Sequence, residues 1–218
     1  MRSSIGLAWT LLKAGYEPNQ IIMKLALRRA LVGCESVLDV GCGAAPNMRL
    51  LGIKHPVGAE GYAPSVEKAR QLGTHDEIVP CDVRALGQHF NARQFDACVA
   101  LDVIEHLPKA DGLKLIADME RIAKKRIIFF TPSGFLSQGH TDKDDLQPHL
   151  SGWEPDEMRQ KGYEVQGLLG PKSLRGEYHR LKRRPAVLWG VLSLLGHFLW
   201  TGRKPERAAA ILCVKTIT

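Results

Sequence analysis

Short apolar runs alternate with amphipathic stretches along most of the chain. Five such runs predict buried strands, at residues 36–40, 57–60, 78–82, 95–101 and 126–130. Stretches with helical periodicity follow at residues 47–51, 65–72 and 111–123. Because near-continuous apolar strands that alternate with helices are typical of parallel sheets, the pattern predicts an α/β fold with helices on both faces of the sheet.

Further elements are expected on both sides of this core. Residues 1–32 are predicted to be helical, with a break at Glu17-Pro18-Asn19. A helix is expected to begin near Ser151, with Glu154, Asp156 and Glu157 in its first turn, and late strands are expected at 162–169 and 209–217. We therefore predict a single domain over residues 1–218, made of N-terminal helices (1–32), a core (36–170), an insert (171–207) and a last strand (208–218).

The composition is that of a folded protein. Hydrophobic residues make up 44% and charged residues 24% of the 218 residues, which argues against a disordered chain. No apolar run reaches the ~20 residues that span a bilayer as a helix, and Lys13 ends the first apolar run without a cleavage site for a signal peptide. The five cysteines contain no CxxC pair, which favours reduced thiols. We therefore predict a cytoplasmic protein, either free or peripheral to a membrane.

The net charge is concentrated in one late segment. The chain carries 30 − 23 = +7, and residues 171–207 alone carry nine basic and two acidic residues, or 9 − 2 = +7. Inside this segment, residues 185–200 are apolar almost all round and contain Trp189 and Trp200. Residues 180–204 are predicted either to contact an anionic membrane surface, to pack internally, or to form a homodimer contact. Nucleic acid is the weaker alternative, because the basic residues lack the aromatic interleaving of an RNA module.

Glycine and acidic residues stand at the ends of the first three predicted strands. Asp39-Val40-Gly41-Cys42-Gly43 closes the first strand, and glycines at such a turn let the backbone approach a ligand. Glu60 ends the second strand, where an acid can accept hydrogen bonds from ribose hydroxyls, and Asp82 ends the third. A nucleoside-bearing cofactor is therefore predicted at this edge of the sheet. An NAD fingerprint is disfavoured, because Pro46 stands at its third glycine position.

These strand ends, together with Phe95-Asp96 and Leu101-Asp102-Val103-Ile104-Glu105-His106-Leu107, resemble the class I S-adenosylmethionine (SAM)-dependent methyltransferases of the type 11 and ubiquinone-biosynthesis kind. The resemblance covers about residues 36–170. It implies a Rossmann-like, doubly wound, seven-stranded sheet that is mostly parallel with one antiparallel strand. It also implies a SAM site formed by Asp39, Gly41 and Gly43 (methionine), Glu60 and Gly61 (ribose), Asp82 and Val83 (adenine), and Leu101.

A metal site is one interpretation of the segment after the fourth strand. If residues 102–107 begin a helix, Asp102, Glu105 and His106 project from one face and could bind Mg²⁺. The pattern resembles the E-x-x-E-H segment of ubiquinone-biosynthesis O-methyltransferases and of small-RNA 3′-terminal 2′-O-methyltransferases, which implies His149 as a fourth ligand. In the alternative interpretation these residues hold no metal, cap the helix and border the acceptor pocket.

The acceptor side allows a second interpretation of the same residues. His149 and Asp102 are candidate catalytic residues, since histidine can remove a hydroxyl proton near neutral pH, and His106 and Trp153 are candidate substrate contacts. Residues 139–145 are expected to form either a lid or a solvated loop. The predicted function is methyl transfer from SAM to a small acceptor, lipophilic in one interpretation, with oxygen as the favoured atom. The alternatives are metal-assisted 2′-O-methylation of an RNA 3′ end and a non-enzymatic adaptor at a membrane surface.

Overall fold

One mixed sheet organises the part of the chain that the structure describes. The computed structural model describes residues 4–13, 18–45, 47–138 and 148–217, so the predicted lid or loop at 139–145 lies outside the described residues. Within them, seven strands form a sheet of order β3-β2-β1-β4-β5-β7-β6. The strands are β1 (Ser36–Val40), β2 (His55–Glu60), β3 (Glu77–Pro80), β4 (Phe95–Leu101), β5 (Ala123–Pro132), β6 (Glu164–Pro171) and β7 (Ala208–Thr216).

The direction of the strands confirms the predicted fold class. The pairs β1–β2, β1–β4, β2–β3 and β4–β5 are parallel, whereas β7 runs antiparallel to both β5 and β6. The chain passes outward from β1 through β2 to β3 and then returns to place β4 on the other side of β1. In sheets of this kind ligands bind outside the carboxyl ends of the strands where the order reverses. The crevice between β1 and β4 is therefore where the fold positions a site.

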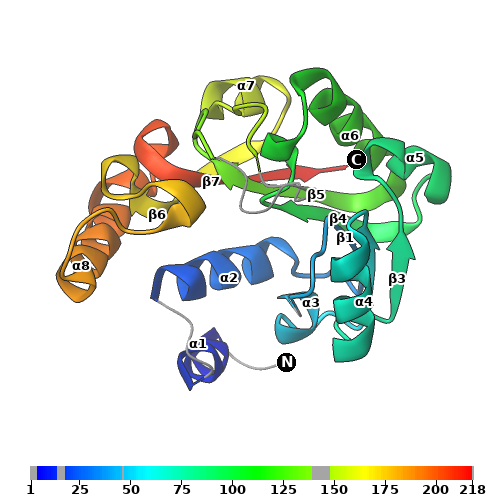
Figure 1. Ribbon diagram of the computed structural model, residues 1–218, viewed down its shortest axis with the longest axis horizontal. Helices are drawn as coiled ribbons and strands as arrows, with labels where there is room; N and C mark the ends of the chain where they lie inside the picture. Colours follow the sequence, from blue (N-terminus) through cyan, green and yellow to red (C-terminus); the bar gives the residue numbers. More distant parts are fainter. Residues whose placement is uncertain (1–3, 14–17, 46, 139–147, 218) are drawn as a thin grey trace.

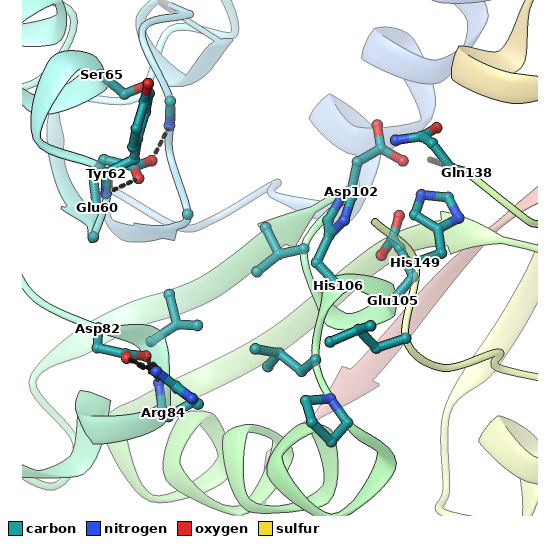
Figure 2. A pocket seen from close by; sticks show the side chains of 18 of the residues that line it. Glu60, Tyr62, Ser65, Asp82, Arg84, Asp102, Glu105, His106, Gln138 and His149 are labelled. Carbon is teal, nitrogen blue, oxygen red and sulfur yellow. Dashed lines mark hydrogen bonds and ion pairs between the residues drawn. The ribbon is translucent and has the colours of Figure 1, made fainter. Parts of the chain in front are cut away.

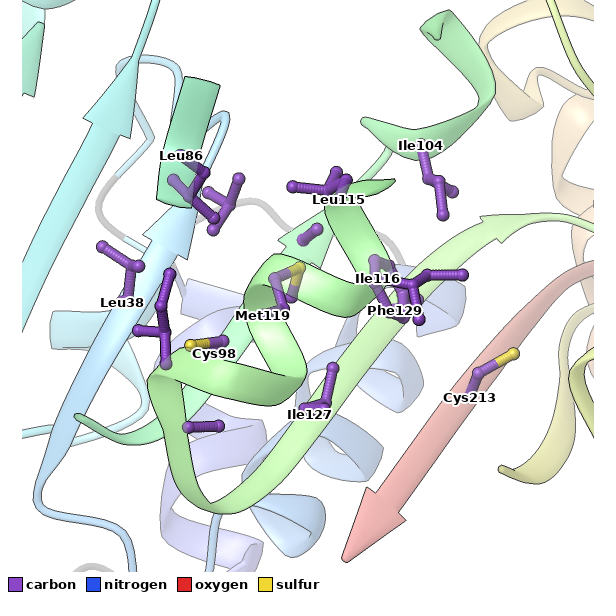
Figure 3. Packing of buried hydrophobic residues seen from close by; sticks show 14 of the residues in the cluster. Leu38, Leu86, Cys98, Ile104, Leu115, Ile116, Met119, Ile127, Phe129 and Cys213 are labelled. Carbon is purple, nitrogen blue, oxygen red and sulfur yellow. The ribbon is translucent and has the colours of Figure 1, made fainter. Parts of the chain in front are cut away.

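Helices cover both faces of the sheet (Figure 1). Because side chains alternate along a strand, Leu38 and Val40 of β1 pack into a core on the side of Leu115, whereas Val37 packs into a second core with Leu27. Figure 3 shows the first core, where Leu115, Ile116 and Met119 lie against the sheet. The helices are α1 (Ser4–Lys13), α2 (Pro18–Ala30), α3 (Asn47–Leu50), α4 (Ala63–Leu72), α5 (Leu86–His89), α6 (Lys109–Ile122), α7 (Pro155–Gln160) and α8 (Ala186–Gly196).

Two local predictions differ from the structure. The helix expected near Ser151 begins at Pro155, because the Ser151 N–H donates to the carbonyl of Glu105 and the backbone of Trp153 bridges to Ser133 and Gly134. Residues 102–107 do not begin an α-helix. Asp102 has a left-handed backbone (φ +53°), and a single 3₁₀ turn, η2 (Ile104–His106), follows it.

The late insert forms a helix at one end of the molecule. α8 continues into a π-helical turn, η5 (His197–Thr201), before the chain returns to β7. Figure 1 shows α8, in orange, beyond β6 and away from the strands that carry the expected cofactor site. Among the described residues, no helix has both the length and the apolar character needed to cross a membrane.

Candidate active site

A cavity of about 870 Å³ opens at the carboxyl edge of the sheet, where the strand order reverses. Six of the residues predicted to hold the cofactor line it: Gly41, Gly43, Glu60, Gly61, Asp82 and Val83. The segments after β4, β5 and β6 supply a second group, which includes Asp102, Glu105, His106, His149, Tyr178 and His179. Figure 2 shows Glu60 and Asp82 on one side of the cavity and Asp102, Glu105, His106 and His149 on the other. We call these two sides the cofactor half and the acceptor half.

The carboxylate of Glu60 joins two backbone segments of the cofactor half through hydrogen bonds. One oxygen accepts from the Gly43 N–H and the other from the Tyr62 N–H, both at 2.8 Å. The side chain belongs to a residue that is 8% exposed, and it still lines the cavity. A carboxylate oxygen has two lone pairs, so each oxygen keeps the capacity to accept a hydrogen bond from a ribose hydroxyl. Two backbone donors thus fix the orientation of this carboxylate at the edge of the cavity.

The turn after β1 requires glycine. Gly41 has a φ of +63° and Gly43 a φ of +55°, a region that side chains with Cβ rarely adopt. A Cβ atom on Gly41 would lie 2.6 Å from Cγ2 of Val103, which itself lines the cavity. The glycines therefore let the backbone of this turn line the cavity, with Gly41 packed against Val103.

Asp82 supplies a second acid to the cofactor half. Its side chain accepts from the N–H of Arg84 at 2.8 Å and so caps the 3₁₀ turn η1 (Val83–Ala85). The Arg84 guanidinium also contacts the carboxylate and holds the pKa of Asp82 below its usual range. The carboxylate is therefore ionised at neutral pH, so both of its oxygens can accept hydrogen bonds from an amino group.

Three predicted site residues do not line the cavity. Asp39 is 2% exposed inside β1, with its carboxylate 3.2 Å from Nε2 of His75. Leu101 packs against the core on the side of α2. Trp153 is fully buried, and its indole N–H lies 3.1 Å from the Ser151 hydroxyl and 3.3 Å from the carbonyl of Ile104. Asp39 and Leu101 are therefore not among the residues that line the cavity, and their contact with the cofactor stays a prediction, whereas the complete burial of Trp153 does not fit the expected aromatic wall.

Three polar side chains meet in the acceptor half. Glu105, His106 and His149 each offer a ligand atom, and these atoms lie within 4.8 Å of one another. Nδ1 of His106 is 3.1 Å from the carbonyl of Pro148, and Nδ1 of His149 is 2.6 Å from the carbonyl of Leu136. A carbonyl only accepts hydrogen bonds, so each Nδ1 carries a proton, and in a neutral imidazole Nε2 is then the nitrogen with the lone pair.

Burial sets the ionisation of this cluster. Glu105 is 2% exposed, and its burial together with the nearby Asp102 raises the pKa of its carboxyl group. One oxygen accepts from the Thr131 hydroxyl at 3.0 Å, while Oε1 has no hydrogen-bond partner within the described residues. Burial lowers the pKa of His149, so its imidazole is neutral at pH 7. The acceptor half thus contains a neutral histidine and a buried carboxyl oxygen that lacks a partner.

His179 is a cavity residue that the sequence did not indicate. Its Nε2 lies 3.3 Å from Oδ1 of Asp102, across 77 residues of sequence. Asp102 is thereby held toward His179 and is not part of the group formed by Glu105, His106 and His149, which differs from the predicted set of four metal ligands. The basic insert contains no motif around His179, so only the folded chain brings it to the site.

Comparisons with known proteins agree with this geometry. Residues 38–131 match the methyltransferase domain family. The probable tRNA methyltransferase 9B of Bos taurus is 32% identical over 87 residues, which cover 39% of this chain and 18% of that protein. The 2-methyl-6-phytyl-1,4-hydroquinone methyltransferase of Synechocystis is 27% identical over 133 residues, which cover 57% of this chain and 38% of that protein. The chain therefore spans less than half the length of these curated relatives.

Solved structures share the fold. The crystal structure of a SAM-dependent methyltransferase from Archaeoglobus fulgidus superposes with a TM-score of 0.58 at 14% identity, covering 95% of this chain and 99% of that one. Residues 38–131 thus match the methyltransferase domain family, and the chain shares the fold of a solved methyltransferase, as the strand ends predicted. The predicted resemblance to methyltransferases is thereby confirmed for this part of the chain, and the fold is shared with a SAM-dependent methyltransferase.

Proposed function

We propose that the protein transfers the methyl group of SAM to an oxygen atom of a small lipophilic acceptor. The observation that carries this proposal is a single cavity that joins the cofactor half to a half containing a neutral histidine. Apolar side chains, among them Leu107, Leu136 and Leu150, line the same cavity. The name of the Synechocystis relative, which specifies a phytyl-substituted hydroquinone, supports an acceptor that combines hydroxyl groups with apolar surface.

For this reaction the protein must align SAM with the acceptor and remove the proton of the acceptor hydroxyl group. Methyl transfer is an in-line displacement, in which alignment supplies much of the rate. Nε2 of His149 accepts the proton of the acceptor hydroxyl while a C–O bond forms, the C–S bond of SAM breaks and S-adenosylhomocysteine leaves. The Leu136 carbonyl fixes the Nδ1 proton of His149, and the nearby Asp102 carboxylate favours the imidazolium that results.

Calorimetry with SAM and S-adenosylhomocysteine tests the proposal first. Both ligands are expected to bind, and labelled methyl groups from SAM are expected to enter the organic phase when hydroxylated quinols are supplied. The variant His149→Ala is expected to keep the affinity for S-adenosylhomocysteine and to lose about 100-fold or more in transfer rate, because only the proton acceptor is removed.

The exposed His89 provides a matched control, since His89→Ala removes a histidine from α5, outside the cavity. No binding of either nucleoside would reject the enzyme and leave the non-enzymatic adaptor. Transfer that is equally fast in the His149→Ala variant would remove the proposed base and leave the methyltransferase assignment standing.

Metal-assisted methylation of an RNA 3′ end is the second candidate, because the residues present fit a divalent cation. Within the described residues, Oε1 of Glu105 is buried and has no hydrogen-bond partner. Backbone carbonyls bind Nδ1 of His106 and of His149, which orients each ring and leaves its Nε2 as the available ligand atom. One carboxylate and two imidazoles suit Mn²⁺ better than the Mg²⁺ expected from the sequence, because Mg²⁺ prefers oxygen ligands. When bound, such a cation would supply a Lewis acid for the oxygens of a terminal ribose.

Thermal unfolding in the presence of Mn²⁺ tests this second candidate. Mn²⁺ is expected to raise the melting temperature of the wild type and not that of Glu105→Gln, since the variant loses the carboxylate ligand. The exposed Glu67→Gln on α4 is the matched control and should respond as the wild type does. If Mn²⁺ has no effect, EDTA leaves transfer unchanged and RNA is not retained at low salt, the metal-assisted reaction is excluded and His149 remains available as the base.

A further inference from the structure

The helix α8 is built with its polar side inward. Ser193 and Thr201 are fully buried and His197 is 5% exposed. These residues stand four positions apart and therefore share one face of α8 and η5. The Ser193 hydroxyl donates to the carbonyl of Leu169 in β6 at 2.9 Å, and a Cβ atom on Gly170 would lie 2.3 Å from the carbonyl oxygen of Ser193. The inner face is thus small, polar and pressed against the sheet.

The opposite side of the helix is apolar and exposed. Val187, Val191, Leu195 and Leu199 recur every four residues and are 80%, 50%, 49% and 81% exposed. Leu188 and Phe198 flank this row, at 52% and 65% exposed. We call these six residues the outer face of α8. Of the alternatives predicted for the insert, internal packing therefore applies to the polar side of α8 and leaves the outer face open.

Cations surround the outer face at both ends of the helix. Arg183 and Arg184 precede it and Arg203 and Lys204 follow it, all four exposed. The guanidinium of Arg183 lies over the Trp189 ring, with Cζ 4.8 Å from the ring centroid, and that of Arg207 lies over the Trp200 ring at 5.1 Å. A second copy docked through the same face would bring two segments of net charge +7 together, which like-charge repulsion opposes. An anionic lipid surface satisfies both features, because acyl chains cover the apolar row and phosphates neutralise the cations.

We propose that the outer face of α8 docks the protein on an anionic bilayer without crossing it. The helix has 11 residues, which suits a position in the plane of the interface. The segment before it, η4 (Glu177–His179), supplies Tyr178 and His179 to the cavity, and Arg180 lies 5.5 Å from the Tyr178 ring. Docking would therefore bring the acceptor half near the lipid. This last step rests on the proposed function, whereas the docking itself does not.

Sedimentation of the whole protein with vesicles tests the proposal. Wild type is expected to sediment with mixed phosphatidylcholine and phosphatidylglycerol vesicles, more weakly with phosphatidylcholine alone, and less as salt is added. Leu195→Ser combined with Leu199→Ser, and Arg203→Glu combined with Lys204→Glu, are each expected to weaken the partition by about tenfold or more. The matched control is Leu72→Ser with Leu113→Ser, which alters exposed leucines on α4 and α6, and it should bind as the wild type does.

Other outcomes separate the alternatives. Equal sedimentation of all variants, or none by the wild type, would overturn the proposal. A wild-type dimer in light scattering that becomes a monomer in the Leu195→Ser/Leu199→Ser variant would assign the face to a second copy and also overturn it. Calorimetry with S-adenosylhomocysteine on the same samples keeps the two proposals apart: vesicle binding without nucleoside binding rejects the methyltransferase alone, and the reverse result rejects the docking alone.

Discussion

The variant Glu60→Ala is expected to bind S-adenosylhomocysteine at least about 100-fold more weakly than the wild type. A hydrogen bond to a charged group contributes about 1.5–3 kcal/mol, and each 1.4 kcal/mol is a factor of about ten in affinity. The alanine variant loses the acceptors for the ribose hydroxyls. It also loses the two bonds that join the carboxylate to the N–H groups of Gly43 and Tyr62, so the glycine turn is no longer fixed. Isothermal titration calorimetry measures the change directly.

Two further variants make this result specific. Glu67→Ala removes an exposed acid from the neighbouring helix α4 and should leave the affinity unchanged. Glu60→Gln keeps the size of the side chain, but its amide nitrogen cannot accept a hydrogen bond. Its affinity should therefore lie between those of the wild type and the alanine variant. Wild-type affinity in Glu60→Ala, with an unchanged melting temperature, would mean that the nucleoside binds elsewhere and would remove the cofactor half from the site.

The cofactor half could be predicted because its signals are local. An apolar run ends in Glu60, the turn after β1 contains glycines, and parallel strands necessarily bring their carboxyl ends to one edge. Asp39 shows the limit of this reasoning. Side chains alternate along β1, so Asp39 points to the other face from Leu38 and Val40 and is buried beside His75. The sequence pattern predicts that strand, but it does not tell which of its faces borders the ligand.

The acceptor half depends on contacts that no local pattern encodes. Asp102 and His179 are 77 residues apart, and both have left-handed backbones (φ +53° and +56°) where their side chains meet. Glu105 and His106 could be found because they adjoin a strand end, and His149 because a resemblance indicated it. His179 comes from an insert, and inserts position side chains through tertiary packing.

The sequence contains a pattern that indicates which face of α8 is buried, but mean hydropathy does not reveal it. A surface helix usually turns its apolar stripe toward the core, so a helix that is apolar almost all round predicts burial. Ser193, His197 and Thr201, spaced four apart, mark a polar face, from which the Ser193 hydroxyl donates to the backbone carbonyl of Leu169 in β6. That polar row indicates the buried side here, and the remaining apolar circumference faces outward.

The variant Trp153→Ala is expected to lower the free energy of unfolding by about 3–5 kcal/mol, the usual cost of truncating a large buried aromatic side chain. Trp153 is fully buried, and its ring lies so close to Gly112 of α6 that a Cβ atom there would be 2.5 Å from Cζ2. The Lys109 ammonium lies 3.5 Å from the ring centroid. A loss of this size should lower the melting temperature by about 10 °C. Urea unfolding followed by circular dichroism measures it.

The same experiment decides between the two roles of this residue. Trp153→Phe keeps most of the packing and loses only the indole N–H bonds to Ser151 and Ile104, so it should lose about 1 kcal/mol. Trp9→Ala, which truncates a tryptophan that is 61% exposed on α1, should leave the stability nearly unchanged. If Trp153→Ala unfolds like the wild type and instead raises the KM for the acceptor, Trp153 is an aromatic wall after all. Because the ring packs beneath η2, which holds Glu105 and His106, the structure favours loss of stability over a selective loss of acceptor binding.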